Sequence, residues 1–223
     1  MRKPAAENQP EYTHLRLLWG WVFYFAAHIL TETLIPPQRC TPMHIWLDDV
    51  IPFREEFVIP YVFWYFLVAF SLVYFLRHNV SLFRRLQIYL IVTQILAVGI
   101  FLLFPSRQDL RPAVFPRDNV LSRLVGLIYR LDTNTGVCPS LHVAFSVAVA
   151  SAWLRERDAH PLWKGFVVLA AVLICLSTMF IKQHSAVDVL CALPVCLAAE
   201  GFVRRCCPEI SPPGASAEGF GTV

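Results

Sequence analysis

The chain has 223 residues, of which 57% are hydrophobic and 16% are charged, and its mean hydropathy is +0.54. A soluble domain of this length needs far more polar surface, so the composition excludes an ordinary soluble globular protein. The net charge of +3 gives no sign of a nucleic-acid partner. We therefore expect membrane lipids to surround the chain and to be its partners.

Three parts can be distinguished along the sequence. Residues 1–14 are polar, residues 15–207 carry the apolar blocks, and residues 208–223 are rich in Pro, Gly, Ser and Ala. We predict one membrane domain over 15–207 and a disordered tail over 208–223, because that tail has too few apolar residues to fold.

Six stretches of the domain are apolar enough to cross a hydrocarbon core, which takes about 20 helical residues. Three of them contain no charged residue: 57–76, 86–104 and 165–181. Three weaker stretches contain a few polar side chains: 17–35, 138–154 and 185–203. Backbone in lipid must satisfy its own hydrogen bonds, so each stretch is predicted to be a helix. The expected fold is all-α, a polytopic membrane protein with six transmembrane helices in one bundle.

Basic residues are distributed unevenly between the two sides of such a bundle. With the N-terminus inside, eleven of the nineteen Lys and Arg residues fall on the inner side. The positive-inside rule therefore favours both termini in the cytoplasm. We expect a multi-pass protein of a bacterial plasma membrane.

The longest connection between spans, residues 105–137, holds five of the eight outer basic residues. A connection this long in a compact membrane protein is usually functional, so we expect its arginines to act at a site. Two other groups are less specific. Asp48 and Asp49 lie in an interfacial helix predicted over 43–53, where we favour solvation of that helix over orientation of the loop arginines. His28 and Glu32 share a helix face in the first span, in a functional or a packing role.

The loop ends in the motif Cys138-Pro139-Ser140-Leu141-His142, where the fourth span begins. Proline suits a first helical turn, and the N–H groups that follow it point outward at the positive end of the helix dipole. Such a helix start can bind an anion. A histidine there can meet a bound phosphate and protonate a departing alcohol.

A second motif, Lys182-Gln183-His184-Ser185-Ala186-Val187-Asp188, lies where the sixth span begins. His184 and Asp188 are four residues apart and so share one helix face. A carboxylate on one imidazole nitrogen fixes the tautomer and leaves the other nitrogen free to attack. The turn at 182–184 and the loop at 105–137 would form the active face of the bundle.

Both motifs open even-numbered spans, so the two helices begin on the same side of the membrane. With the N-terminus inside, that side is exoplasmic. Each residue alone has a simpler interpretation as an interfacial histidine, a helix-dipole partner or an arginine bound to lipid headgroups. Their joint placement at one face favours a phosphate-handling site.

The two motifs resemble the second and third signatures of the type 2 phosphatidic acid phosphatase superfamily of membrane lipid phosphatases and phosphotransferases. The superfamily has Pro-Ser-Gly-His where this chain has Pro139-Ser140-Leu141-His142, and its third signature ends in His, three residues, then Asp. The leucine resembles the branch that includes the inositol phosphorylceramide synthases and related bacterial proteins. The resemblance implies that His184 is the nucleophile, Asp188 its orienting carboxylate and His142 the general acid.

The basic residues of the superfamily are matched less closely. The arginine that usually stands six residues before the nucleophile is Thr178 here, and Lys182 is expected to supply its charge. Of the first signature, Arg111-Pro112 fits the end, while Phe104 occupies the lysine position and Arg107 is the natural substitute. Ser140, Arg107, Arg111 and Lys182 are therefore the predicted substrate-binding residues.

The sequence thus predicts an enzyme, a lipid phosphate phosphatase that acts on phosphatidate, a prenyl diphosphate or a similar substrate. Two alternatives stay open: a phosphotransferase with an alcohol acceptor, and an inactive lipid-binding or transport homologue. The seven cysteines form no CxxC pair and no metal-ligand spacing. We expect neither a metal nor another cofactor.

Overall fold

The computed structural model describes residues 13–207 and is almost entirely helical. The predicted tail at 208–223 and most of the polar segment at 1–14 lie outside the described residues. The longer helices are α1 (Trp19–Leu34), α3 (Val58–His78), α4 (Val80–Leu103), α5 (Val120–Leu131), α6 (Leu141–Arg155), α7 (Pro161–Phe180) and α8 (Ala186–Cys206). The short elements are the 3-10 turns η1 (Thr13–Leu18), η2 (Pro37–Arg39) and η3 (Glu55–Phe57), the helix α2 (Trp46–Val50), and the strands β1 (Thr41–Pro42) and β2 (Ser106–Arg107).

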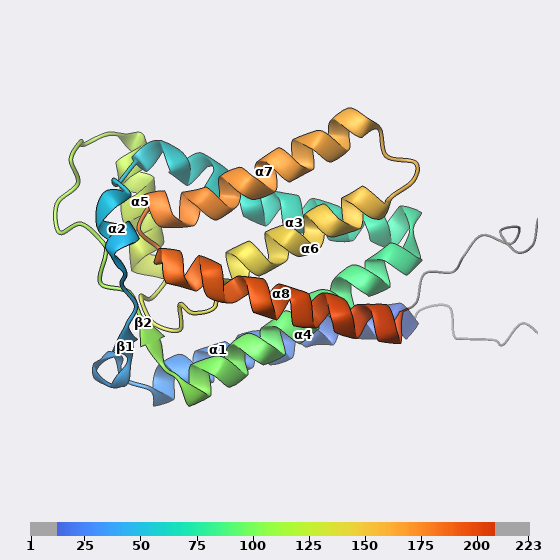
Figure 1. Ribbon diagram of the computed structural model, residues 1–223, viewed down its shortest axis with the longest axis horizontal. Coiled ribbons are helices and arrows are strands. Elements are labelled where there is room, and N and C mark those ends of the chain that lie inside the picture. The colour runs from blue at the N-terminus through green and yellow to red at the C-terminus, as the bar shows by residue number, and fades with distance from the viewer. Residues whose placement is uncertain (1–12, 208–223) are drawn as a thin grey trace, which may run out of the picture.

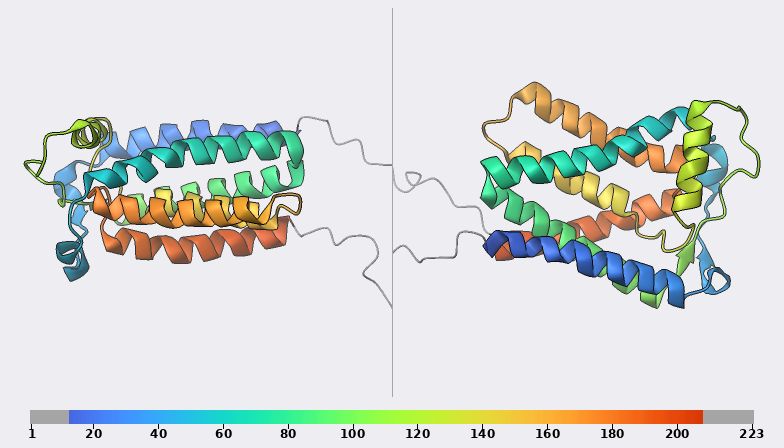
Figure 2. Two further views of the ribbon diagram at one scale, coloured as in Figure 1. Left: turned by 90° about the horizontal axis from the view of Figure 1, so that it is seen from above. Right: turned by 180° about the vertical axis from the view of Figure 1, so that it is seen from behind.

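Helices α1, α3, α4, α6, α7 and α8 run side by side in one bundle (Figures 1 and 2). Helices α2 and α5 and both strands gather at one end, at the left of Figure 1. Helices α6 and α8 begin at this end of the bundle, and the C-terminus of α8 lies at the opposite end (Figure 1). The structure therefore confirms that the two histidine motifs open helices at one face of the bundle.

Four helices in the described part of the chain are long and apolar enough to cross a membrane. They span Glu55–His78, Val80–Leu103, Pro161–Phe180 and Ala186–Cys206. The first and fourth predicted spans correspond to α1 with 16 residues and α6 with 15. At a rise of ~1.5 Å per residue these helices are shorter than a hydrocarbon core of ~30 Å. The structure confirms a helical fold with four candidate membrane spans in its described part, which is compatible with a membrane protein, and six spans remain an expectation.

The core of the bundle lies between α3, α4, α6, α7 and α8. Phe75, Leu90, Val149 and Ile174 are buried there, and their side chains come from four different helices. The indole Nε1 of Trp153 donates a hydrogen bond of 2.9 Å to the hydroxyl of Ser71, which joins α6 to α3. Small residues along α6 and α8, such as Ala148 and Ala199, let these helices approach closely.

The connection at 105–137 contains regular structure that the sequence analysis did not predict. Strand β2 pairs in parallel with β1 in the register Thr41 to Ser106. Helix α5 begins at a capping box, in which the Asn119 side chain accepts from the backbone N–H of Ser122 and Ser122 bonds back. Helix α5 lies across the end of the bundle (Figure 2, right). Val125 of α5 is buried against α3, whereas Arg123 and Arg130 are exposed.

Asp48 holds the start of α8, which corrects the expectation that it solvates an interfacial helix. Its side chain is 3% exposed. Its Oδ2 accepts from the Ser185 hydroxyl at 2.5 Å, and its Oδ1 accepts from the Ala186 backbone N–H at 2.7 Å. Asp49 is exposed and contacts His44 at 2.8 Å. The two neighbouring aspartates therefore have different roles. The hydrogen bonds from Ser185 and Ala186 to Asp48 fix the start of α8 against α2, and we call this contact the clamp.

The first prediction concerns this clamp. Asp48→Ala leaves a buried hydroxyl and a buried N–H without an acceptor, and each such loss costs about 1–3 kcal/mol. We expect the free energy of unfolding to fall by about 2–4 kcal/mol, whereas exposed Asp49→Ala should stay within about 0.5 kcal/mol. Thermal unfolding of the purified variants in detergent measures both. Equal midpoint temperatures of unfolding for the two variants would show that the contact of Asp48 with the start of α8 contributes nothing to stability.

Candidate active site

His184 lies in the turn before α8, with its ring against the side chain of Asp188. The distance from His184 Nδ1 to Asp188 Oδ2 is 3.3 Å, and Asp188 is fully buried. The same Oδ2 accepts the backbone N–H of Ser185 at 2.9 Å, which fixes the carboxylate. An imidazole that donates from Nδ1 keeps an unprotonated Nε2, the nitrogen that can attack an electrophile.

The two motifs contact each other directly. The backbone N–H of Ser140, just before α6, donates to the backbone carbonyl of Asp188 at 3.1 Å. The hydroxyl of Ser140 is completely buried and has no hydrogen-bond partner in the described chain. The start of α6 therefore offers a free hydroxyl next to the His184–Asp188 pair.

His142 lies in the first turn of α6, near His184. The ring centroids of the two histidines are 5.6 Å apart. The His142 ring stacks on Tyr61 at 4.6 Å and packs against Trp64 at 4.4 Å, both from α3. Its Nε2 is buried and has no partner among the described residues. Two aromatic rings hold His142 while one ring nitrogen remains free for a ligand.

Both histidines line one cavity of about 730 Å³. Its remaining walls are mostly aromatic and aliphatic side chains of α1, α3 and α5, among them Trp21, Tyr65 and Leu127. Helices α1 and α3 flank this side of the bundle and α5 crosses its end (Figure 2, right). A mostly apolar cavity with a few polar groups at one end suits an amphiphile whose polar head meets the histidines.

The predicted basic ligands lie outside this cavity, because no arginine or lysine of residues 13–207 lines it. Arg107 contacts Asp109 at 3.1 Å and donates to the Pro37 carbonyl at 3.3 Å. Arg111 donates to the carbonyls of Tyr129, Asp132 and Thr133 and lies 4.6 Å from the Tyr129 ring. Both guanidinium groups thus hold the loop together, and their phosphate-binding role stays a prediction.

Lys182 also has partners within the fold. Its ammonium donates to the carbonyls of Asp48 and Ile51 at 2.8 and 2.6 Å. Burial lowers the pKa of Lys182, and the carboxylates of Asp48 and Asp49 oppose that effect. Its backbone has a φ of 56°, which turns the chain sharply after α7. Lys182 therefore joins the turn to α2, and its role in substrate binding stays a prediction.

Thr178, which stands where the superfamily has an arginine, closes the same turn. Its backbone carbonyl accepts the N–H groups of Gln183 and His184 at 2.9 and 3.0 Å. The side chain is fully buried and its hydroxyl bonds back to the Cys175 carbonyl at 2.8 Å. This position contributes backbone geometry to the site and no positive charge.

Asp132 is a residue of the cavity that the sequence analysis missed. It follows α5, lines the cavity with His184, and accepts a hydrogen bond of 3.0 Å from Gln183 Nε2. Burial raises the pKa of the Asp132 carboxyl, while the charges of His184 and Arg111 partly oppose this rise. Asp132 belongs to no short motif, so only its place in the arginine-rich loop could have drawn attention to it.

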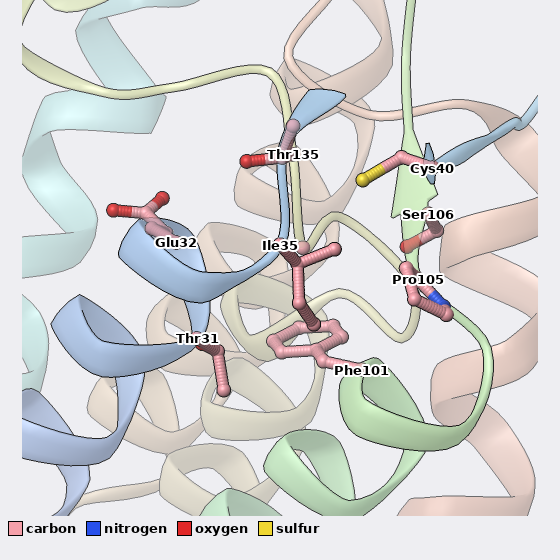
Figure 3. A pocket seen from close by; sticks show the side chains of 9 residues that line it. Thr31, Glu32, Ile35, Cys40, Phe101, Pro105, Ser106 and Thr135 are labelled. Atoms are coloured by element: carbon pink, nitrogen blue, oxygen red, sulfur yellow. The ribbon is translucent and has the colours of Figure 1, made fainter. Parts of the chain in front are cut away.

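His28 and Glu32 of α1 reach the same region. His28 lines the large cavity, and its Nε2 lies 3.5 Å from Glu32 Oε1. The hydroxyl of Thr133, next to Asp132, donates to Glu32. Glu32 also lines a smaller cavity of about 20 Å³, room for roughly one water (Figure 3). The pair therefore packs α1 against the loop and adds a polar corner to the large cavity.

The arrangement can perform nucleophilic chemistry on a bound electrophile. His184 supplies a nucleophilic nitrogen oriented by Asp188, and His142 can exchange a proton from the adjacent helix start. Within residues 13–207, no group of three or more His, Cys, Asp and Glu side chains is placed to hold a metal ion. The described site is thus a histidine pair at the polar end of an apolar cavity.

Comparison with known proteins gives one partial likeness. No protein-family model matches the chain, and no solved structure matches it. A protein of Dictyostelium discoideum named as a PA-phosphatase related-family protein is 41% identical over 71 residues, which are 30% of this chain and 12% of that protein. The chain thus matches only a small part of the length of this relative. The likeness points to the phosphatase-like superfamily that the two motifs resemble and bears on no particular branch.

Proposed function

We propose that the chain is a membrane phosphatase that removes phosphate from a lipid phosphate through a phosphohistidine intermediate on His184. The observation that carries this proposal is the contact between His184 and the buried carboxylate of Asp188 at the polar end of one apolar cavity. The ring of His142 lies beside this pair, with its centroid 5.6 Å from the centroid of the His184 ring. The named relative and the two motifs support the same class of reaction.

The reaction has two steps. Nε2 of His184 attacks phosphorus, the bond from phosphorus to the lipid oxygen breaks, and protonated His142 gives its proton to that oxygen. A water molecule then attacks phosphorus, the bond from phosphorus to His184 Nε2 breaks, His142 takes one proton of the water, and inorganic phosphate leaves. The first N–H groups of α6, which have no partner within the helix, and the unpaired Ser140 hydroxyl stabilise the charge on the transferring phosphoryl group.

The cavity also defines how a lipid would bind. Its walls from α1, α3 and α5 are apolar over most of their length, so they suit hydrocarbon tails. The tails would enter from the bilayer between α1 and α3, and the phosphate would stop at the two histidines. In our proposal this end of the bundle faces the exoplasm, because the inner side carries the larger share of basic residues.

A phosphotransferase is the second candidate. It uses the same intermediate, but an alcohol replaces water in the second step. The absence of arginine and lysine from the described cavity walls favours this candidate, because a phosphodiester donor carries less charge than a phosphate monoester dianion.

The second prediction separates the two histidines. His184→Ala removes the nucleophile and should abolish both turnover and any covalent phosphoenzyme. His142→Ala should reduce turnover of a lipid phosphate by about 10²–10⁴-fold, the usual contribution of a general acid. It should retain more activity on p-nitrophenyl phosphate, whose leaving group needs little protonation. Steady-state rates and phosphoenzyme trapping measure both effects.

Three results would contradict these roles. Normal turnover by folded His184→Ala would mean that the nucleophile is another residue. An equal loss on both substrates for His142→Ala would make that residue a phosphate ligand. Binding of lipid phosphate without turnover by the wild-type protein would support an inactive lipid-binding homologue.

The third prediction concerns the metal requirement of the reaction and the molecule that accepts the phosphoryl group. Phosphate release should continue in strong chelator and be inhibited by vanadate, which mimics the pentacoordinate phosphoryl group. Addition of a long-chain alcohol should leave the yield of inorganic phosphate unchanged for a phosphatase and replace it with a transferred lipid product for a phosphotransferase. Loss of activity in chelator that magnesium restores would contradict the histidine mechanism.

The fourth prediction concerns orientation. In a variant without native cysteines, Asp118→Cys near α5 and Arg84→Cys in α4 place single thiols at opposite ends of the bundle. A membrane-impermeant maleimide added to intact cells should label position 118 only. Labelling at position 84 alone would reverse the orientation while leaving the site chemistry unchanged.

A further inference from the structure

The polar end of the cavity holds acidic groups and lacks basic side chains. Asp132 lines it, and Glu32 lies behind His28, which also lines it. Among residues 13–207 no Lys or Arg side chain reaches these walls. A site built only for a phosphate dianion would be expected to present cations instead, since a nearby carboxylate repels the dianion.

Asp132 is held in place but keeps a free oxygen. Gln183 donates to its Oδ2 at 3.0 Å, and the Arg111 guanidinium bonds its backbone carbonyl at 3.1 Å and not its carboxylate. Its Oδ1 accepts no hydrogen bond from the described residues. Gln183 directly precedes His184, so Asp132 adjoins the place where the phosphorus atom would be attacked.

Other atoms around this corner also have unused hydrogen-bonding capacity. His28 Nδ1 and Gln183 Oε1 are buried and have no partner in the described part of the chain. Buried polar atoms without partners cost stability unless a ligand or water completes them, and the partly buried carboxylate of Asp132 lies beside them. Burial indeed raises the pKa of the Asp132 carboxyl. In its ionised form the Asp132 carboxylate only accepts hydrogen bonds, so a group that pairs with that form is a hydrogen-bond donor.

We propose that Asp132, braced by Gln183, binds a hydroxyl or ammonium group of the lipid headgroup close to the reacting phosphate. This inference rests on the proposed function and narrows its substrates to phosphate lipids that carry such a donor. Asp132 is then a specificity residue that contacts substrate, whereas His184, His142 and Asp188 carry out the phosphoryl chemistry. Plain alkyl and prenyl phosphates, which have no donor there, would be poor substrates.

The test uses three probes of equal chain length in detergent micelles: hexadecyl phosphate and its β-hydroxy and β-amino counterparts. Wild-type protein should prefer the two donor-bearing probes by about 10- to 100-fold in kcat/KM, the range of a hydrogen bond to a charged group. In Asp132→Ala, the ratio of kcat/KM for a donor-bearing probe to kcat/KM for hexadecyl phosphate should be close to one. Asp132→Asn should reduce the preference for the amino probe more than that for the hydroxy probe, because it removes the charge and keeps an acceptor. Hexadecyl phosphate, which brings no donor to Asp132, is the reference substrate against which each variant's preference is calculated.

Two controls keep the result interpretable. Asp118→Asn changes an exposed aspartate of the same connection, which pairs with Arg123 outside the cavity, and should behave as wild type. His184→Ala gives binding constants without turnover, and it should bind the amino probe more tightly than hexadecyl phosphate by a similar factor. If His184→Ala hydrolyses the probes as wild type does, the proposed function fails.

The subsite itself has its own contradicting outcomes. Equal turnover of the three probes by wild type, together with equal binding to His184→Ala, would overturn it while leaving the phosphatase intact. A uniform loss on all three probes for Asp132→Asn would assign Asp132 a structural role.

Discussion

The carboxylate of Asp48 accepts hydrogen bonds from Ser185 and Ala186 at the start of α8, and the position of His184 depends on this contact. The turn that carries His184 is short, so polar contacts rather than apolar packing must fix it. The Lys182 ammonium donates to the backbone carbonyls of Asp48 and Ile51, and the Asp188 carboxylate contacts the imidazole of His184. A nucleophile must be held within a fraction of an ångström to be effective, and buried, mutually bonded partners achieve this.

This clamp decides which helix start is open to an anion. The first N–H groups of α8 already have carboxylate partners, since Asp48 bonds Ala186 and Asp188 bonds Ser185. The sequence predicts an anion site at the start of α6. At α6 the Ser140 hydroxyl is buried without a partner, so this helix retains its capacity for an anion. A phosphate would therefore bind on the His142 side and present its phosphorus to His184.

The sequence predicted the parts of the fold that depend on local pattern. Long apolar runs indicated the helices, and the spacing of His184 and Asp188 indicated their contact, although His184 lies in the turn before α8 and reaches Asp188 across the helix start. The partners of Arg111 and Lys182 could not be predicted, since they are backbone carbonyls brought close only by the tertiary fold. A charged side chain in a loop carries the same sequence signal whether it binds a ligand or a carbonyl. The burial of Asp48 was missed for the same reason.

The distribution of charge around the cavity then limits what the bundle can bind. Four arginines of the loop are bonded to carbonyls and carboxylates of the loop, of η2 and of η3, so their charge shapes the end of the bundle: Arg107, Arg111, Arg117 and Arg123. What faces the cavity is imidazole, amide, hydroxyl and the carboxylate of Asp132. In the low-dielectric wall of the cavity, the electrostatic interaction of each of these groups with a ligand is stronger than it would be in water. In our proposal, selectivity among lipid phosphates depends on the donors that a headgroup brings to Asp132, while the apolar walls from α1, α3 and α5 suit any tail of matching volume.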